Sequence, residues 1–292
     1  MYKQHIGKYF RKLPFLVVIF GFLFLSPVYF PEAGSASARQ NIKISLWPHE
    51  ESDLKSDPMV VYGRFENGFR YALMENHEPK NRVNIRLVVQ AGSMHEEDRE
   101  EGLAHYLEHM LFNGSTHFKP GELVKYFQDL GMQFGHDANA RTGFYETVYD
   151  IVLPDGKRES LDKGFLIAQD YAKGALLLDS EVEREKKVVL AKKRSRDSSS
   201  YRTYISEMKF KFPGAAISKR IPIGETAALE KMTSKKLKDF YDAWYRPENI
   251  ILVVVGDFDQ KTAVSLVRER FQKLSARAPP RPAPSFGDIK HN

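Results

Sequence analysis

The segment 102–118, GLAHYLEHMLFNGSTHF, contains three residues of the types that bind and use a catalytic metal: His105, Glu108 and His109. On an α-helix these positions are i, i+3 and i+4, so the three side chains share one face. Two imidazoles one turn apart can both reach a Zn²⁺ ion, and a neighbouring carboxylate can take a proton from the bound water. The spacing therefore predicts a zinc site in which His105 and His109 bind the metal and Glu108 is a general base.

The alternative is a surface helix that carries two histidines by chance. Nine histidines in 292 residues make such an accident conceivable, so the spacing alone does not decide. Leu103, Leu107 and Met110 give the same helix a buried side, which favours a motif held in a fixed place. The chain has no cysteine, so any metal must be bound by His and carboxylate ligands, and disulfides are excluded.

The segments around the motif alternate between strand and helix patterns. A strand over 82–92 leads into the motif helix, 99–112, and a hairpin over 60–75 precedes it. Apolar periodicity and capping residues predict further strands over 144–153 and 249–258 and further helices over 120–130, 159–178, 180–197, 200–211, 233–245 and 260–274. The sequence therefore predicts one domain of mixed helices and strands over 58–276.

The two ends of the chain have a different composition from the domain. Residues 1–38 combine a basic start, an apolar run over 13–30 and the small residues ASA, which predicts a cleaved export signal and a periplasmic or secreted protein. The alternative is an uncleaved anchor, which would be the only part of the chain in a membrane. Residues 39–57 are a polar lead-in segment, and residues 277–292 are a Pro-rich tail or linker.

The overall charge gives no reason to expect a nucleic-acid partner. The formal net charge is +6, and four basic residues against Glu32 place +3 of it in the first 38 residues, which leaves +3 for the rest. A charge this small does not predict binding to a polyanion. A hydrophobic content of 42% and a charged content of 28% are ordinary for a globular protein.

The motif segment resembles the pitrilysin/insulinase family of zinc metallopeptidases, in which His-x-x-Glu-His is the metal-binding motif. Three other blocks, over 134–154, 181–190 and 244–259, resemble the family in the same order along the chain. The resemblance covers about 58–276 and is to the bacterial periplasmic zinc proteases in particular. It implies an α+β fold, with a mixed, mainly antiparallel sheet covered by helices, and the N-terminal half of a peptidase.

The resemblance also implies roles for single residues. His105 and His109 would be zinc ligands, with Glu108 as the catalytic base, and Glu185 would support the site by orienting a histidine. Asn139 and Ala140 would lie on an edge strand whose backbone pairs with an extended peptide substrate. Members of the family pair two homologous halves around the substrate, so a second half-domain, in another chain or a dimer, is the expected partner.

One position departs from the pattern of the family. The third zinc ligand there is a glutamate seven residues after another glutamate; Glu185 matches the first of these, but the ligand position holds Lys192. A lysine must lose its proton to bind a metal, and its ordinary pKa is about 10.4. Two functions therefore stay open: a zinc endopeptidase acting on extended peptides or small unfolded proteins, or a catalytically impaired half that binds peptides or scaffolds a partner.

Overall fold

The structure is a computed structural model that describes residues 46–290 except 130 and 134. The export signal predicted over 1–38 lies outside the described residues. Among the residues that are described, no helix is both long enough and apolar enough to cross a bilayer.

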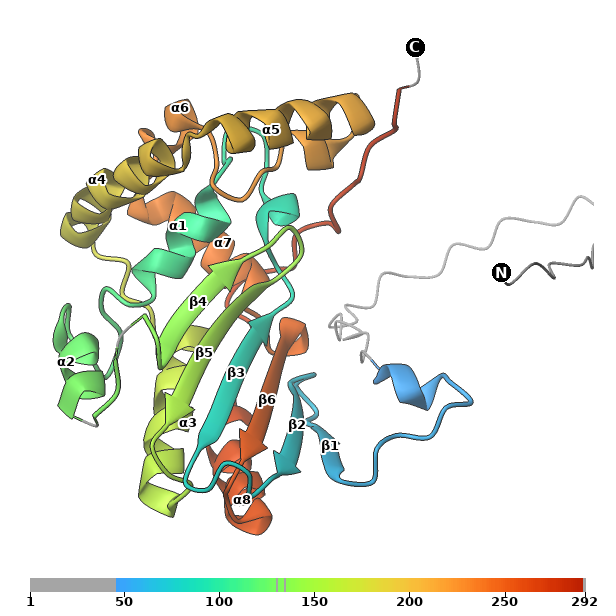
Figure 1. The fold of residues 1–292 in the computed structure, drawn as a ribbon, viewed down its shortest axis with the longest axis vertical. Coiled ribbons are helices and arrows are strands. Elements are labelled where there is room, and N and C mark those ends of the chain that lie inside the picture. Colours follow the sequence, from blue (N-terminus) through green and yellow to red (C-terminus); the bar gives the residue numbers. More distant parts are fainter. Residues whose placement is uncertain (1–45, 130, 134, 291–292) are drawn as a thin grey trace, which may run out of the picture. The chain divides into compact units, whose positions relative to one another are not determined.

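A six-stranded sheet forms the centre of the domain, in the order β1-β2-β6-β3-β5-β4 (Figure 1). Only β2 and β6 pair in parallel; the other neighbours are antiparallel, which confirms the predicted mixed, mainly antiparallel sheet. The strands are β1 (Val60–Arg64), β2 (Arg70–Glu75), β3 (Val83–Val89), β4 (Ala138–Thr142), β5 (Thr147–Leu153) and β6 (Ile250–Gly256). β4 is therefore an edge strand, beside β5.

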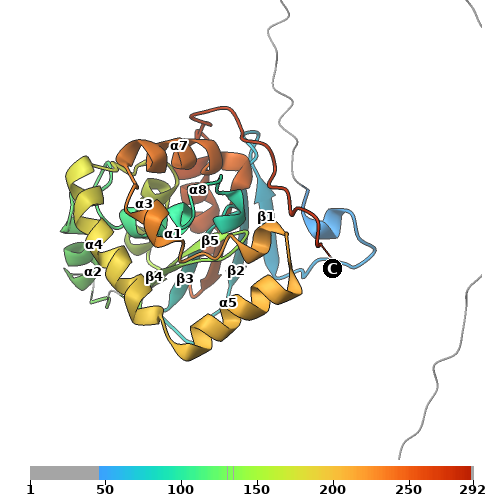
Figure 2. The same cartoon turned by 90° about the horizontal axis from the view of Figure 1, so that it is seen from above.

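Helices cover one face of this sheet and crowd its upper end (Figures 1 and 2). The helices are α1 (Leu103–Met110), α2 (Glu122–Asp129), α3 (Arg158–Lys173), α4 (Asp179–Arg196), α5 (Ser199–Lys211), α6 (Thr226–Leu229), α7 (Ser234–Trp244) and α8 (Gln260–Phe271). α3 packs on β5 and α8 on β2, whereas α1 contacts α4, α7 and β4. The helix α1, which carries the His-x-x-Glu-His motif, thus lies between the sheet edge and a second helix.

The central strands show why the sheet has a covered and an open face. In β3 and β6, buried side chains alternate with more exposed ones, as the two-residue repeat of a strand requires. Ile85 pairs with Val254 and Leu87 with Leu252, and all four are fully buried. This face of the sheet and the helices together form the hydrophobic core. Packing in this core fixes the position of α1 relative to the sheet.

The N-terminus of α1 is held by a buried acid from the preceding loop. The Glu96 carboxylate accepts hydrogen bonds from the backbone N–H groups of Gly102 (3.0 Å) and Ala104 (2.9 Å), which have no partner within the helix. Arg220 fixes this loop, since its Nε donates to the backbone oxygen of Glu96 at 3.1 Å and its guanidinium pairs with Glu101. Gly102 has φ +95°, and a Cβ there would meet Gly224 at 2.7 Å, so the approach requires glycine.

The Pro-rich segment after α8 lies against the domain as far as the structure describes it. Arg281 forms ion pairs with Glu97 (3.4 Å) and Glu100 (3.2 Å), in the loop before α1. Further along, the backbone N–H of Lys290 donates to the Pro213 oxygen at 2.8 Å, close to the end of α5. This segment therefore bridges the loop that leads into α1 and the region beyond α5.

Candidate functional site

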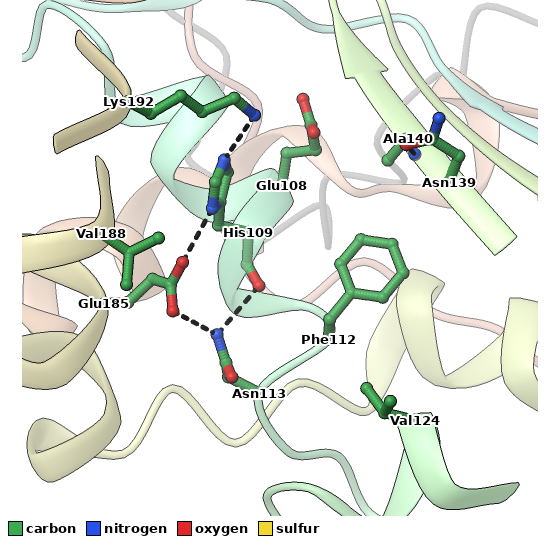
Figure 3. A pocket seen from close by; sticks show the side chains of 10 residues that line it. All are labelled: Glu108, His109, Phe112, Asn113, Val124, Asn139, Ala140, Glu185, Val188 and Lys192. Atoms are coloured by element: carbon green, nitrogen blue, oxygen red, sulfur yellow. Dashed lines mark hydrogen bonds and ion pairs between the residues drawn. The ribbon is translucent and has the colours of Figure 1, made fainter. Parts of the chain in front are cut away.

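A cavity of about 340 Å³ opens between α1, α4 and the edge strand β4 (Figure 3). It is lined by Glu108, His109, Phe112, Asn113, Val124, Asn139, Ala140, Glu185, Val188 and Lys192. Five of the six site residues predicted from the sequence are in this lining: Glu108, His109, Glu185, Asn139 and Ala140. The structure thus brings together, in one cavity, residues from three elements that are distant in the sequence.

The sixth predicted residue, His105, does not line the cavity. It is only 4% exposed and packs beside His109, with ring centroids 4.8 Å apart at an interplanar angle of 78°. Burial is the main cause that lowers the pKa of His105 to about 2, and the positive charge of Lys192 adds to it, so the His105 imidazole is neutral. Its Nδ1 atom is buried, and no described residue forms a hydrogen bond with it.

Glu108 is held by a residue from the edge strand. Its Oε2 accepts a hydrogen bond of 2.5 Å from the Thr142 hydroxyl, on β4. Burial raises the pKa of Glu108 above its ordinary value, and the Thr142 hydrogen bond and nearby positive charges oppose this. A buried carboxyl with a raised pKa can exchange a proton, as a general base must. Thr142 was not predicted as a site residue, although the Asn-Ala-x-Thr block that resembles the family contains it.

Glu185, on α4, fixes the orientation of the second histidine. Its Oε1 accepts a hydrogen bond of 2.8 Å from His109 Nδ1, and its Oε2 accepts one of 3.0 Å from Asn113 Nδ2. Asn113 also donates to the backbone oxygen of His109 at 3.2 Å. With the proton on Nδ1, the Nε2 atom of His109 carries a lone pair that points into the cavity. Asn113 is a further site residue that the sequence pattern did not reveal.

Lys192 donates a hydrogen bond to that lone pair (Figure 3). Its Nζ lies 3.1 Å from His109 Nε2, so the ammonium donates a hydrogen bond to the atom that a metal ion would bind. Glu185 and Lys192 are seven residues apart on α4, and this two-turn spacing places one on each side of the His109 ring. The departure from the family pattern at position 192 is therefore located directly at the expected metal position.

The residues present do not form the donor set of a catalytic zinc. Such a site has three protein ligands and one water. In the described part of the chain, no group of three or more His, Cys, Asp or Glu side chains is placed to hold a metal ion. α1 supplies two imidazoles, but α4 supplies a cation at the third position, and a cation repels a metal ion.

Asn139 and Ala140 lie on β4, beside the cavity. Asn139 is exposed, and its Oδ1 accepts the N–H of Ala140 at 2.9 Å. β4 pairs with β5 on one side, and no other strand of the described region pairs with its outer side. The backbone of this outer side can therefore accept another extended strand.

Comparison with known proteins gives a consistent result. Residues 71–211 match the model of the family described as Insulinase (Peptidase family M16), and residues 231–292 match the model of the Peptidase M16 inactive domain. The "Probable zinc protease PqqL" of Haemophilus influenzae is 35% identical over 239 residues, which is 82% of this chain and 25% of that protein. The chain thus spans about a quarter of the length of this curated relative.

Solved structures agree with this result. The first half of the periplasmic protease PqqL from Escherichia coli is 32% identical, with a TM-score of 0.76 over 82% of this chain and 51% of that one. The ferredoxin protease FusC, in complex with Arabidopsis ferredoxin, is 30% identical, with a TM-score of 0.72 over 79% of this chain and 26% of that one. The motif, the fold and these similarities lead to one conclusion: the chain belongs to the insulinase family of peptidases, family M16, and corresponds to the first part of PqqL-like zinc proteases.

Proposed function

We propose that this chain is the peptide-binding half of an exported endopeptidase of the insulinase family. The observation that carries the proposal is the cavity between α1, α4 and the unpaired side of β4, where family residues converge. An extended peptide can add to β4 as a further strand, which recognises main chain and therefore accepts many sequences. Extended peptides and small unfolded proteins are the ligands that suit this mode, because their backbone N–H and C=O groups are free to pair with β4.

The contact between Lys192 and His109 favours binding over hydrolysis in this chain. The ammonium engages the His109 lone pair, and the third carboxylate ligand is absent. A catalytic zinc bound by two imidazoles alone is held weakly. The site therefore retains the shape that receives a peptide but not the complete set of donors that binds the metal.

Hydrolysis is the second candidate function, and specific observations favour it. Glu108 is buried at the cavity and held by Thr142, where it could take a proton from an attacking water molecule. Glu185 fixes the ring of His109 with a lone pair facing the cavity, which is the arrangement that a metal-binding histidine needs. The contacts that would orient a metal-binding histidine and its neighbouring acid support this second candidate, and Lys192 is the residue that opposes it.

A second homologous half is the partner that we propose, in the periplasm. The relatives are much longer than this chain, and the Escherichia coli protein is described as periplasmic. The cavity is bordered by the edge strand β4, so a second half placed against this edge would shield the cavity from water. The predicted export signal supports the same location.

Metal content and cleavage, measured on the same variants, test the proposal. The wild-type chain is expected to hold little zinc after dialysis, whereas Lys192→Glu restores a carboxylate and should bind close to one zinc per chain. Lys192→Met is the matched control, because it removes the charge without adding a ligand. Binding of a labelled unfolded peptide should be retained by the wild type without zinc.

Two results would contradict the proposal. Close to one zinc per wild-type chain, together with zinc-dependent cleavage of the peptide, would make hydrolysis the function and Lys192 no obstacle. Absence of peptide binding by the wild type and by Lys192→Glu would remove the peptide-binding function altogether.

A further inference from the structure

The ammonium of Lys192 lies in a cavity without a carboxylate partner. Its Nζ contacts His109 Nε2, and the described part of the chain places no carboxylate oxygen within the 4.0 Å of an ion pair. The side chain is half-buried, so water compensates its charge only in part. A lysine ammonium has three N–H donors, and His109 uses one of them. The site therefore holds a cation with unused donors that face a cavity.

Arg196 adds a second positive charge close to the same place. It follows Lys192 by four residues, so both lie on the same side of α4. Its side chain is exposed and lies one turn beyond Lys192, next to the cavity lining. No carboxylate of the described region forms an ion pair with Arg196 either.

The two acids of the cavity do not neutralise these cations. Both oxygens of Glu185 are already engaged, by His109 Nδ1 and Asn113 Nδ2. Glu108 Oε2 accepts a hydrogen bond from the Thr142 hydroxyl. Neither acid forms an ion pair with Lys192 or Arg196 in the described part of the chain, so an incoming anion would find available donors at Lys192.

The other residues that line the cavity indicate which chemical groups the anionic ligand carries besides its negative charge. Phe112, Val124 and Val188 supply an apolar wall from three different helical regions. Asn139 and Ala140 bring the free side of β4 to the same cavity. A ligand that fits these features has a backbone that pairs with β4, an apolar side chain for the wall, and a carboxylate for Lys192.

We propose that this cavity binds the C-terminal residue of a peptide, an apolar residue whose free carboxylate pairs with Lys192 and Arg196 while the preceding main chain pairs with β4. The inference rests on the proposed peptide-binding function and specifies its ligand. A divalent metal would polarise an internal peptide carbonyl, whereas an ammonium pairs best with a full negative charge. The lysine thereby converts a site for the middle of a peptide into a site for its end.

Fluorescence anisotropy with two labelled peptides tests the inference. Both peptides have the same sequence, end in phenylalanine and carry the label at the N-terminus; one has a free C-terminal carboxylate and the other a C-terminal amide. Titrations are made with the full chain in the presence of a chelator, so that no metal contributes. The acid is expected to bind at least about tenfold more tightly than the amide, as one charge-assisted hydrogen bond provides.

Three variants assign the preference to its residues. Lys192→Met should reduce the preference for the acid to within about twofold, and Arg196→Met should reduce it in part. Lys187→Met, on an exposed part of the same helix, should leave it unchanged. Circular dichroism verifies that each variant is folded, and the comparison of the two peptides on the wild type does not depend on any variant.

Each other result overturns the inference in a distinguishable way. Equal binding of acid and amide by the wild type would reject C-terminal recognition and leave peptide binding intact. A preference for the acid that persists in both Lys192→Met and Arg196→Met would show that another cation makes the contact. If neither peptide binds, the inference fails together with the proposed function.

Discussion

Helices α1 and α4 form two sides of the same cavity, but they are held in very different ways. Every residue of α1 except His109 is buried, and its first N–H groups are bound by the buried Glu96. α4 has 18 residues, of which only Val182, Glu185 and Val189 are buried. The side chain at position 192 can therefore change without repacking the core, whereas the motif on α1 is built into it. This explains how the two sides of one cavity can differ in how closely they follow the family.

The largest loss of stability is expected from a substitution in the buried side of α1. Leu107 is fully buried, so Leu107→Ala should lower the free energy of unfolding by about 2–5 kcal/mol. The matched control is Val188→Ala on α4, where the side chain is 48% exposed and the change should stay within about 0.5 kcal/mol. Urea unfolding followed by circular dichroism measures both. Similar losses in the two variants would remove the contrast between the helices.

The second largest loss of stability is expected when the N-terminal cap of α1 is removed. Glu96→Ala leaves the N–H groups of Gly102 and Ala104 buried without an acceptor, at a cost of about 2–4 kcal/mol. Glu97→Ala removes an exposed acid next to it, whose ion pair with Arg281 contributes at most about 1 kcal/mol. Chemical denaturation of the two variants under the same conditions gives the comparison. An unchanged stability in Glu96→Ala would mean that water replaces the lost acceptor.

The orienting role of Glu185 can be measured in a chain that binds zinc. In the Lys192→Glu background, Glu185→Gln should weaken zinc binding by about 10- to 100-fold, because the hydrogen bond to His109 Nδ1 loses its charge. Glu183→Gln is the control, since Glu183 is exposed and its ion pair among the described residues is with Lys186 on the same helix. Competition with a chelator of known affinity gives the dissociation constants. Equal effects of the two substitutions would contradict an orienting role.

The smallest change in stability is expected from a substitution at Lys192 on α4. Lys192→Met should change the free energy of unfolding by no more than about 0.5 kcal/mol, because the side chain contributes nothing to the core. Lys187→Met provides the reference for an exposed lysine on the same helix. Thermal unfolding of the three proteins is sufficient. A loss of more than about 2 kcal/mol in Lys192→Met alone would show that Lys192 is a structural residue rather than a ligand-facing one.

Local pattern predicted most of the fold. The helices and strands that the sequence predicted from apolar periodicity all occur, with ends that differ by a few residues. The short helix α6 was not predicted, because four residues give too little periodicity. The strand β4 was expected from the family resemblance alone, since its apolar alternation is interrupted by Asn139 and Arg141.

The candidate site was predictable in part, for a similar reason. Residues His105, Glu108 and His109 share a helix face by spacing alone, and the structure places the two imidazole rings side by side. The sequence did not identify Thr142 and Asn113 as site residues, because each binds a carboxylate that is distant in the sequence. Thr142 binds Glu108, and Asn113 binds Glu185. No local pattern identifies a hydroxyl or an amide as the partner of a particular carboxylate.

The sequence by itself determined the chemistry that is available: two imidazoles and an acid on one turn of helix, no thiolate, and a lysine where the family has a glutamate. Only the tertiary structure decided what the lysine does. Lys192 and His109 are 83 residues apart, and their contact depends on how α4 packs across α1. The physical reason is that helix periodicity fixes which side chains share a face, whereas packing between elements fixes which atoms of different faces meet.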